Sequence, residues 1–219
     1  MLLSYIGSAF HEFWSRCDRD AKQHPDDVLF LKDIDQPRGR HRRPATFEFE
    51  YPPCPFDGPL EHARVVICFA NPKYAGLQGD IEAIIYRQRQ GLAELPPEWD
   101  DWYEPRIARP LGLLMDDARP WVSVLNVCPY ASQNMNGSET SLAAGLPSVW
   151  AAQRHLRDVL IPRALNGEIQ LVFLRKHELW GITEGWVSDH IHIVRGRELG
   201  GRIPDELAQQ LQSWLQRFG

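Results

Sequence analysis

The stretch that decides the fold is ARVVICFANPKYAG, which spans Ala63 to Gly76. Residues 65–70 are apolar without interruption, and the first part of the run is β-branched. A short apolar run of this kind predicts a strand buried on both faces, as in a parallel sheet covered by helices. The run stops at Asn71-Pro72, a turn-initiating pair that cannot continue a sheet ladder. Asn71 is therefore expected at the carboxyl end of a central strand, where open α/β sheets bind ligands.

A purely structural role is the alternative for Asn71, because asparagine is frequent in turns. A second copy of the pattern favours a functional role. WVSVLNV, from Trp121 to Val127, is again an apolar run, and it ends at Asn126 shortly before Pro129. The sequence thus predicts two buried strands that each end in an asparagine.

Two further apolar runs predict strands, and basic residues follow each of them. The first run is residues 169–174, followed by Arg175, Lys176 and His177. The second is residues 191–194, followed by Arg195 and Arg197. If the strands are parallel, their carboxyl ends gather these cations and the asparagines at one edge of the sheet.

Helices are expected between the strands, since apolar residues recur there at helical spacing. Asp80 is a candidate N-cap for one of them. The predicted helices cover residues of about 5–18, 80–90, 106–115, 147–165 and 205–218; an edge strand is expected at 47–53, and loops at 95–102 and 131–146. This alternation predicts a three-layer α/β/α fold with a central, mostly parallel, four-stranded sheet.

The length of 219 residues suits one sizeable α/β domain with an extension. We expect an N-terminal helix and polar extension over residues 1–46 and the α/β domain over residues 47–219. The extension contains a basic run, RGRHRR, at residues 38–43. A solvated loop and a phosphate-contacting loop are both compatible with that run.

Charge, cysteine spacing and the lengths of the apolar runs limit the classes of protein to which the chain can belong. The formal net charge is −5, so no overall electrostatic attraction draws the chain to nucleic acid, although a local basic cleft is compatible with it. The four cysteines show no C-x-x-C spacing, so we expect reduced thiols and no metal site. No Gly-rich phosphate loop occurs, and no cofactor is expected. No apolar run reaches the roughly 20 residues of a membrane span, and a cytoplasmic protein without membrane contact is expected.

The chain resembles the uracil-DNA glycosylase superfamily over residues of about 47–217. The residues that carry the resemblance are VVICFANPKYAG (Val65 to Gly76) and VSVLNVCPYASQNMNGSETSLAAGLP (Val122 to Pro147). They resemble most the branch of single-strand-selective monofunctional enzymes and their bacterial relatives. The resemblance implies an α/β/α fold of that family and DNA or a nucleobase as partner, with the base extruded into a snug pocket.

The resemblance also implies roles for individual residues. Asn71, followed by Pro72 and Tyr74, falls where the family positions the water that attacks the sugar C1′. Asn126 falls where the family pairs with the Watson–Crick edge of uracil, and an amide can both donate and accept there. Tyr86 is the nearest aromatic residue for stacking on the base.

The sequence departs from the family pattern at several positions. Phe69 and Lys73 stand where the family usually has glycine, which crowds the backbone approach. The His-Pro-Ser motif expected after the last strand is replaced by IVRGRELGG. Arg195 or Arg197 would then supply positive charge to the leaving base. Leu199-Gly200-Gly201 is compatible either with a duplex-wedging loop or with a plain turn.

Three functions are compatible with these residues. The first is an N-glycosylase that removes uracil or a related base. The second is a catalytically degenerate relative that binds a nucleotide, nucleic acid or protein, which the missing histidine and the acidic charge favour. The third is a different hydrolytic chemistry that uses His177, for which the alternative is an ordinary surface histidine. The fold alone does not decide among them.

Overall fold

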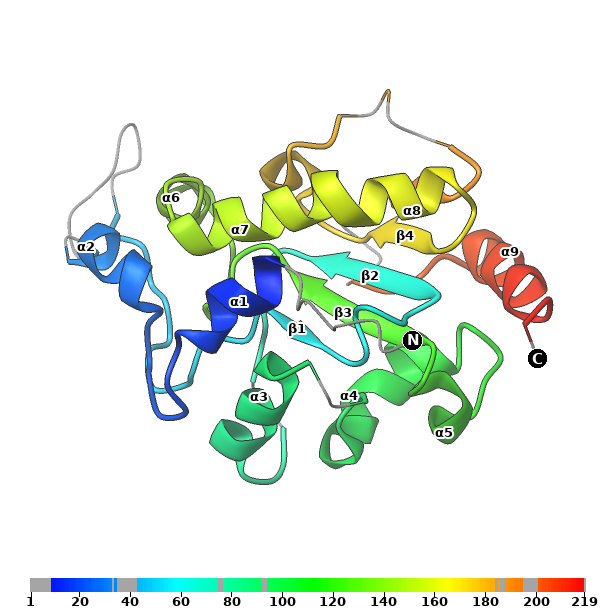
Figure 1. Ribbon diagram of the computed structural model, residues 1–219, viewed down its shortest axis with the longest axis horizontal. Helices are drawn as coiled ribbons and strands as arrows, with labels where there is room; N and C mark the ends of the chain where they lie inside the picture. The colour runs from blue at the N-terminus through cyan, green and yellow to red at the C-terminus, as the bar shows by residue number, and fades with distance from the viewer. Residues whose placement is uncertain are drawn as a thin grey trace, which may run out of the picture.

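The computed structural model is an α/β fold built on one five-stranded mixed sheet (Figure 1). It describes residues 9–32, 34, 43–74, 77–91, 94–183, 185, 188–194 and 201–218. The strands are β1 (Phe56–Asp57), β2 (Val65–Phe69), β3 (Val122–Asn126), β4 (Gln170–Phe173) and β5 (Ile191–Ile193). The four apolar runs that predict strands are all confirmed as strands.

The strand order is β1-β3-β2-β4-β5. β2 pairs in parallel with both β3 and β4, and β4 pairs in parallel with β5. β1 pairs antiparallel with β3, with Asp57 opposite Val124. The predicted count of four strands is therefore wrong, because a short antiparallel strand adds to the four parallel ones.

The edge strand expected at residues 47–53 is also wrong, since that segment forms no strand. Prolines at positions 52 and 53 have no backbone N–H to donate to a ladder. The chain joins the sheet only after them, at Phe56 and Asp57.

Helices and turns cover both faces of the sheet. The longer helical segments are α1 (Ala9–Ser15), α3 (Ile81–Arg89), α6 (Gly137–Ala143), α7 (Pro147–His155), α8 (Ile161–Leu165) and α9 (Asp205–Leu215). The short ones are η1 (Pro25–Asp27), α2 (Val28–Leu31), η2 (Pro97–Trp99), α4 (Asp100–Tyr103), η3 (Glu104–Ala108), α5 (Met115–Ala118), η4 (Leu156–Leu160) and η5 (His177–Trp180). Asp80 caps α3 as predicted, because its side chain accepts a hydrogen bond from the Ala83 N–H at 3.0 Å.

Three predicted segments differ from the structure. The helix expected at residues 106–115 is replaced by the π-helical turn η3 and a bend in which Gly112 has φ +67°. Pro110 explains part of this, because its ring prevents a regular helix from continuing. The loops expected at 95–102 and 131–146 contain α4 and α6, and Asn136 caps α6.

The buried side chains form two clusters, one on each face of the sheet. α1, α6, α7 and α8 contribute to one cluster, and α3, α4, α5 and α9 contribute to the other. Figure 1 shows the same division, with α7 and α8 on one side of the sheet and α3, α4 and α5 on the other. The chain therefore crosses one face between β2 and β3 and the other face between β3 and β4. This reversal makes the carboxyl ends of β2 and β4 a topological switch point, where such sheets bind ligands.

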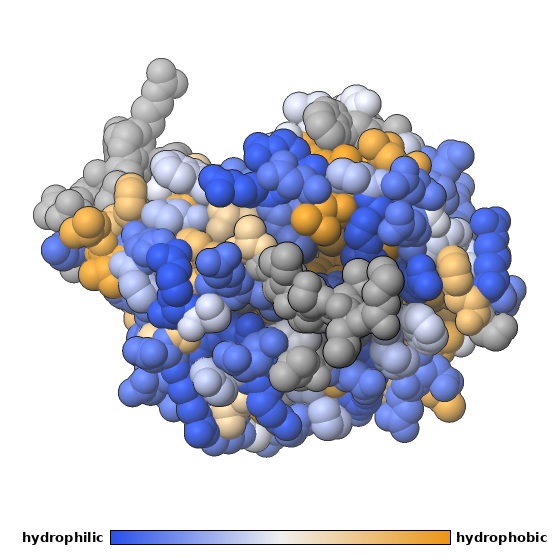
Figure 2. Space-filling model, viewed as in Figure 1, coloured by the Kyte–Doolittle hydropathy of each residue, from blue (hydrophilic) through white to orange (hydrophobic). Residues whose placement is uncertain are grey.

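The described residues of the N-terminal extension pack into the core of the α/β domain. Phe10, Trp14, Cys17 and Leu31 all belong to the buried cluster beneath α7. Figure 2 shows hydrophobic colour gathered over α2, where Leu29 is 70% exposed. α2 thus meets the core through Leu31 and presents other apolar side chains outward.

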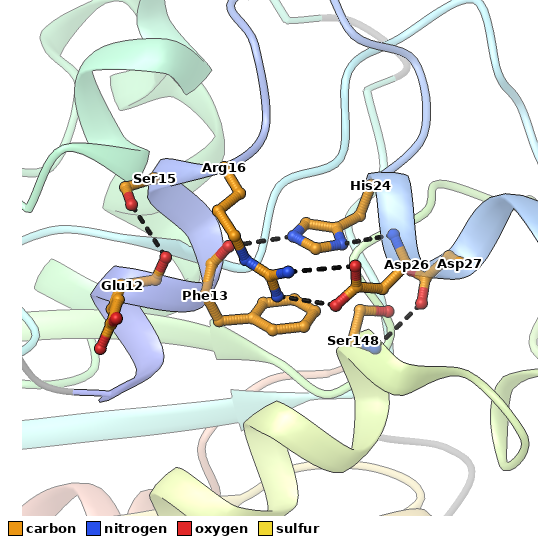
Figure 3. A network of polar contacts seen from close by, with 8 residues as sticks. All are labelled: Glu12, Phe13, Ser15, Arg16, His24, Asp26, Asp27 and Ser148. Atoms are coloured by element: carbon orange, nitrogen blue, oxygen red, sulfur yellow. Dashed lines mark hydrogen bonds and ion pairs between the residues drawn. The ribbon is translucent and has the colours of Figure 1, made fainter.

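A polar network fixes this extension to the domain (Figure 3). The Asp27 carboxylate is buried and accepts hydrogen bonds from the Tyr130 hydroxyl at 2.7 Å and from the Ser148 N–H at 3.0 Å. Ser148 lies in the first turn of α7, where unpaired N–H groups and the helix dipole favour a carboxylate. Asp26, next to it, instead forms an ion pair with Arg16 at 2.7 Å near the surface.

Candidate functional site

A cavity of about 710 Å³ lies at the carboxyl ends of the central strands. Its lining comes from the segment after β2, from the end of β3 and from the turn after β4. This is the switch-point edge of the sheet, and the volume lies within the range of small-molecule sites. Asn71 and Asn126 both line this cavity, so the two asparagine motifs meet in space.

Asn71 is half-buried just beyond β2, and its amide group is oriented by its neighbours. Its Nδ2 lies 3.0 Å from the Pro72 carbonyl oxygen, 3.1 Å from Ser132 Oγ and 3.3 Å from the Ser132 carbonyl oxygen. All of these can accept, so the nitrogen is turned toward them and Oδ1 is the other end of the amide. Oδ1 is thus available as an acceptor in the cavity.

Asn126 is the last residue of β3 and is only 3% exposed. Its backbone N–H donates to the Pro55 carbonyl oxygen at 2.8 Å, and its Nδ2 donates to the Cys54 carbonyl oxygen at 3.2 Å. The second bond fixes which end of the amide is nitrogen, since a carbonyl oxygen can only accept. One N–H of Nδ2 and the Oδ1 acceptor are left for a ligand.

Asp57, which the sequence analysis did not identify, places a buried carboxyl group in the same cavity. It is 5% exposed and lines the cavity together with Cys54 and Tyr103. Burial raises the pKa of the Asp57 carboxyl from 3.8 to about 6, although hydrogen bonding to Tyr103 and Cys54 partly offsets this. Burial also raises the pKa of the Cys54 thiol, which stays protonated and donates to Asp57 Oδ1 at 3.5 Å.

Aromatic rings form one wall of the cavity. Phe69 and Trp102 line it with their ring centroids 5.8 Å apart, and Tyr103 packs edge-on against Trp102 at 5.1 Å. Trp99 also lines the cavity. Such rings offer flat apolar faces against which a planar ligand can stack. Trp99 and Trp102 fall in a segment that the sequence analysis treats as a loop, so neither was assigned a role.

Cations surround the mouth of the cavity. Arg43, Lys73, Arg106, Arg175 and Lys176 line it, and all but Arg106 are exposed. Arg106 lies over the Trp102 ring at 5.0 Å. Lys176 has φ +53°, the one positive φ outside glycine among the described residues, which is a strained conformation of the kind found at functional sites. The mouth therefore suits the anionic part of a ligand.

Of the other predicted site residues that the structure describes, two line the cavity and two do not. Pro72 and Tyr74 line the cavity, with the Tyr74 hydroxyl donating to the Pro52 carbonyl oxygen at 3.1 Å. Tyr86 on α3 and His177 at the start of η5 are not among the described residues that line it. Tyr86 instead lies 6.0 Å from Arg89, and His177 Nδ1 lies 4.0 Å from Glu178.

The two predicted catalytic arginines, Arg195 and Arg197, lie outside the described residues. Gly201, which follows that segment, has φ +81° and approaches Phe69 so closely that a Cβ there would lie 3.3 Å from its ring. Gly201 therefore lies beside Phe69, and it lines the cavity.

No group of three or more His, Cys, Asp or Glu side chains in the described part of the chain is arranged to hold a metal ion. The four cysteines are all buried and unpaired. In the same ranges, no helix has the length and apolar character needed to cross a bilayer.

Comparison of the chain with models of known protein families, with curated proteins and with solved structures found no match.

Proposed function

We propose that this protein binds a nucleobase in the cavity at the ends of β2 and β3 and hydrolyses its N-glycosidic bond. The observation that carries the proposal is the meeting of Asn71 and Asn126 in one cavity of about 710 Å³. The proposal includes a uracil-DNA glycosylase-like arrangement of the α/β/α layers. The adjacency of the two asparagine-ended strands, β2 and β3, supports that finer assignment.

In the proposed reaction, Asn71 Oδ1 accepts a hydrogen bond from a water molecule and orients it toward C1′ of the sugar. The water oxygen bonds to C1′ as the C1′–N bond breaks, and the bonding electrons leave with the base. The attacking water loses one proton to solvent, and this proton balances the negative charge of the departing base. Cations at the cavity mouth, such as Arg175, stabilise negative charge on the phosphates and the leaving base.

Asn126 hydrogen-bonds to the edge of the base from the buried part of the cavity. Its remaining N–H and its Oδ1 form a donor–acceptor pair that matches a carbonyl next to a ring N–H. Phe69 and Trp102 provide the stacking wall. Binding of this kind requires an extruded or single-stranded base, because a paired base cannot enter a cavity.

The test is excision of uracil from single- and double-stranded oligonucleotides by the wild type and by Asn71→Ala and Asn126→Ala. We expect each substitution to lower the rate by about 100-fold or more, the usual effect of removing one positioned polar group. Asn166→Ala is the matched control, since Asn166 is exposed and lies outside the cavity lining, near the amino end of β4. Full activity in both cavity variants would contradict the assigned roles.

A binding protein without catalysis is the second candidate. It is favoured by the absence of histidine among the described residues that line the cavity. Failure of folded wild-type protein to release any base, combined with saturable binding of an oligonucleotide, would support this candidate over hydrolysis.

A further inference from the structure

Asp57 is a buried carboxyl group that the proposed reaction leaves without a role. Only 5% of its surface is exposed, and the exposed part lies in the cavity. A carboxylate is costly to bury unless it is paired or hydrogen-bonded. The described residues provide no cation within ion-pairing distance of it, and its side-chain donors are two neutral groups, the Tyr103 hydroxyl and the weak Cys54 thiol at 3.5 Å.

Asp57 and Asn126 lie on the same face of the sheet. Asp57 in β1 is directly opposite Val124 in β3, and Asn126 is two residues further along β3. Side chains two residues apart on a strand point to the same face, and diagonal neighbours across a ladder lie about 7–8 Å apart. Val124 lies between them and also lines the cavity. The carboxyl and amide groups therefore project from the same face of the sheet into the cavity, with Val124 between their positions on the ladder.

The two groups together present a defined hydrogen-bonding pattern. Asn126 contributes one free N–H donor and the Oδ1 acceptor, because its other N–H is held by the Cys54 carbonyl oxygen. Ionised Asp57 adds acceptors only. Cys54 lies on the side of Asn126 away from Asp57 along the β1–β3 ladder, so Nδ2 is turned away from Asp57 and Oδ1 is the nearer end of the amide. A planar ligand that fits these groups must carry, in order, an acceptor, a donor and a second donor.

The edges of nucleobases differ at the third of these positions. Uracil presents a carbonyl, a ring N–H and a second carbonyl, so one carbonyl oxygen would face the Asp57 carboxylate. Guanine presents a carbonyl, a ring N–H and an exocyclic amino group, so it matches all three positions. Hypoxanthine has the first two groups and only a C–H at the third, which would leave Asp57 desolvated and unpaired.

We infer that Asp57 is a specificity-determining residue and that the cavity takes a base with a guanine-type edge in preference to uracil. This inference rests on the proposed function, since it assigns a base to the same cavity. The recognition is by two neighbouring N–H donors on the base, with Asp57 accepting from the exocyclic amino group. A charged acceptor makes this bond stronger than a neutral one and the mismatch correspondingly costly.

The test is calorimetric binding of 2′-deoxyguanosine, 2′-deoxyinosine and 2′-deoxyuridine to the full chain at pH 7.5. Deoxyguanosine and deoxyinosine differ only by the amino group. We expect the wild type to bind deoxyguanosine about tenfold or more tightly than either of the others, the value of one hydrogen bond to a charged group. This comparison does not depend on any variant being folded.

Asp57→Asn provides the second arm, because it keeps the shape of the side chain and replaces one acceptor by a donor. It should abolish the preference for deoxyguanosine and improve binding of deoxyuridine. Asp189→Asn is the matched control; Asp189 is exposed and lines a different surface hollow. It should leave all affinities unchanged.

The outcomes separate this inference from the proposed function. Binding of deoxyuridine or deoxyinosine as tight as that of deoxyguanosine would overturn the role of Asp57 and leave a base-binding cavity. Binding of none of the three nucleosides by folded protein would overturn both.

Discussion

At the scale of single residues, the ionisation of Asp57 links the cavity to stability. Burial raises its pKa from 3.8 to about 6, so the folded protein holds this proton more tightly than the unfolded chain. The stability that the group contributes is therefore present below pH 3.8 and is lost as the pH rises through about 6. The difference of about two pH units corresponds to about 3 kcal/mol in the free energy of unfolding.

Asp57→Asn should therefore raise the free energy of unfolding at pH 7.5, by as much as about 3 kcal/mol, and change it little at pH 4. Urea denaturation of wild type and variant at both pH values measures this. Asp189→Asn is again the control and should have little effect at either pH. Destabilisation by Asp57→Asn at pH 7.5 would contradict a costly buried carboxylate.

The same ionisation sets the pH range of base selection. The groups that face Asp57 are Cys54, Tyr74 and Tyr103, and burial raises the pKa of each of them. They remain protonated across the neutral range, so Asp57 is the group that changes charge. Preference for a guanine-type edge is expected above about pH 6 and is lost below it, where the protonated carboxyl no longer offers two acceptors.

At the scale of elements, the turn η1 holds two adjacent aspartates of different character, of which Asp27 fixes the N-terminal extension to α7 and Asp26 pairs within the extension. Asp27 is fully buried and accepts from Tyr130 and Ser148, whereas the side chain of Asp26 is 37% exposed and pairs with Arg16. Figure 3 shows the contacts of Asp27 with Ser148 and of Asp26 with Arg16. Buried and exposed carboxylates of one turn can thus be compared directly.

Asp27→Ala should lower the free energy of unfolding by about 2–4 kcal/mol, because it leaves buried donors unpaired. Asp26→Ala should lower it by about 1 kcal/mol or less, since an exposed ion pair contributes little. Chemical denaturation of both variants at neutral pH tests the contrast. Equal effects would mean that the Asp27 network does not hold the extension in place.

The contact between α1 and α7 contains an acid-sensitive group, in contrast to Asp57, whose contribution to stability is lost as the pH rises. His155 is 5% exposed, stacks on Phe10 with ring centroids 4.8 Å apart, and has no partner for Nε2 among the described residues. Burial, together with the charge of His11, lowers its pKa from 6.5 to about 4. The stability it contributes is present above pH 6.5 and is lost as the pH falls through about 4, a change of about 3 kcal/mol.

His155→Phe keeps an aromatic ring against Phe10 and cannot become charged. We expect it to lose less stability than the wild type between pH 7 and pH 4, as measured by guanidinium denaturation at the two pH values. His62→Gln, at an exposed histidine, is the control and should follow the wild type. An unchanged acid response in His155→Phe would assign the acid sensitivity to other groups.

At the scale of the whole molecule, the parallel core was predictable from sequence because each buried strand is a continuous apolar run. Residues 65–70 and 121–127 need no tertiary information to be identified as strands. β1 could not be found in this way, since Phe56–Asp57 is only two residues long and is a strand only because β3 pairs with it. The short helices near residues 97–103 depend in the same way on packing over the sheet.

The residues of the candidate site likewise fall into those that local sequence predicts and those that depend on tertiary packing. Asn71 and Asn126 were predictable because each ends an apolar run, and strand ends of a parallel sheet converge. Asp57 and Trp102 were not, because their closeness to Asn126 and Phe69 arises from the antiparallel pairing of β1 and the packing of α4. The CPFDGP segment around Asp57 is typical of a turn. It contains a strand only because Phe56 and Asp57 pair with β3.

The measurement that tests the central claim most directly is the response of the two asparagine side-chain amides to a nucleoside. In ¹⁵N-labelled protein, the Nδ2 resonances of Asn71 and Asn126 are followed as deoxyguanosine and deoxyuridine are added, with the exposed Asn166 as internal reference. The account predicts saturable shifts of both cavity amides with a single affinity for each nucleoside, and no shift of Asn166. Saturable binding of a nucleoside that moves neither Asn71 nor Asn126, or the absence of any shift in the folded protein, would contradict it.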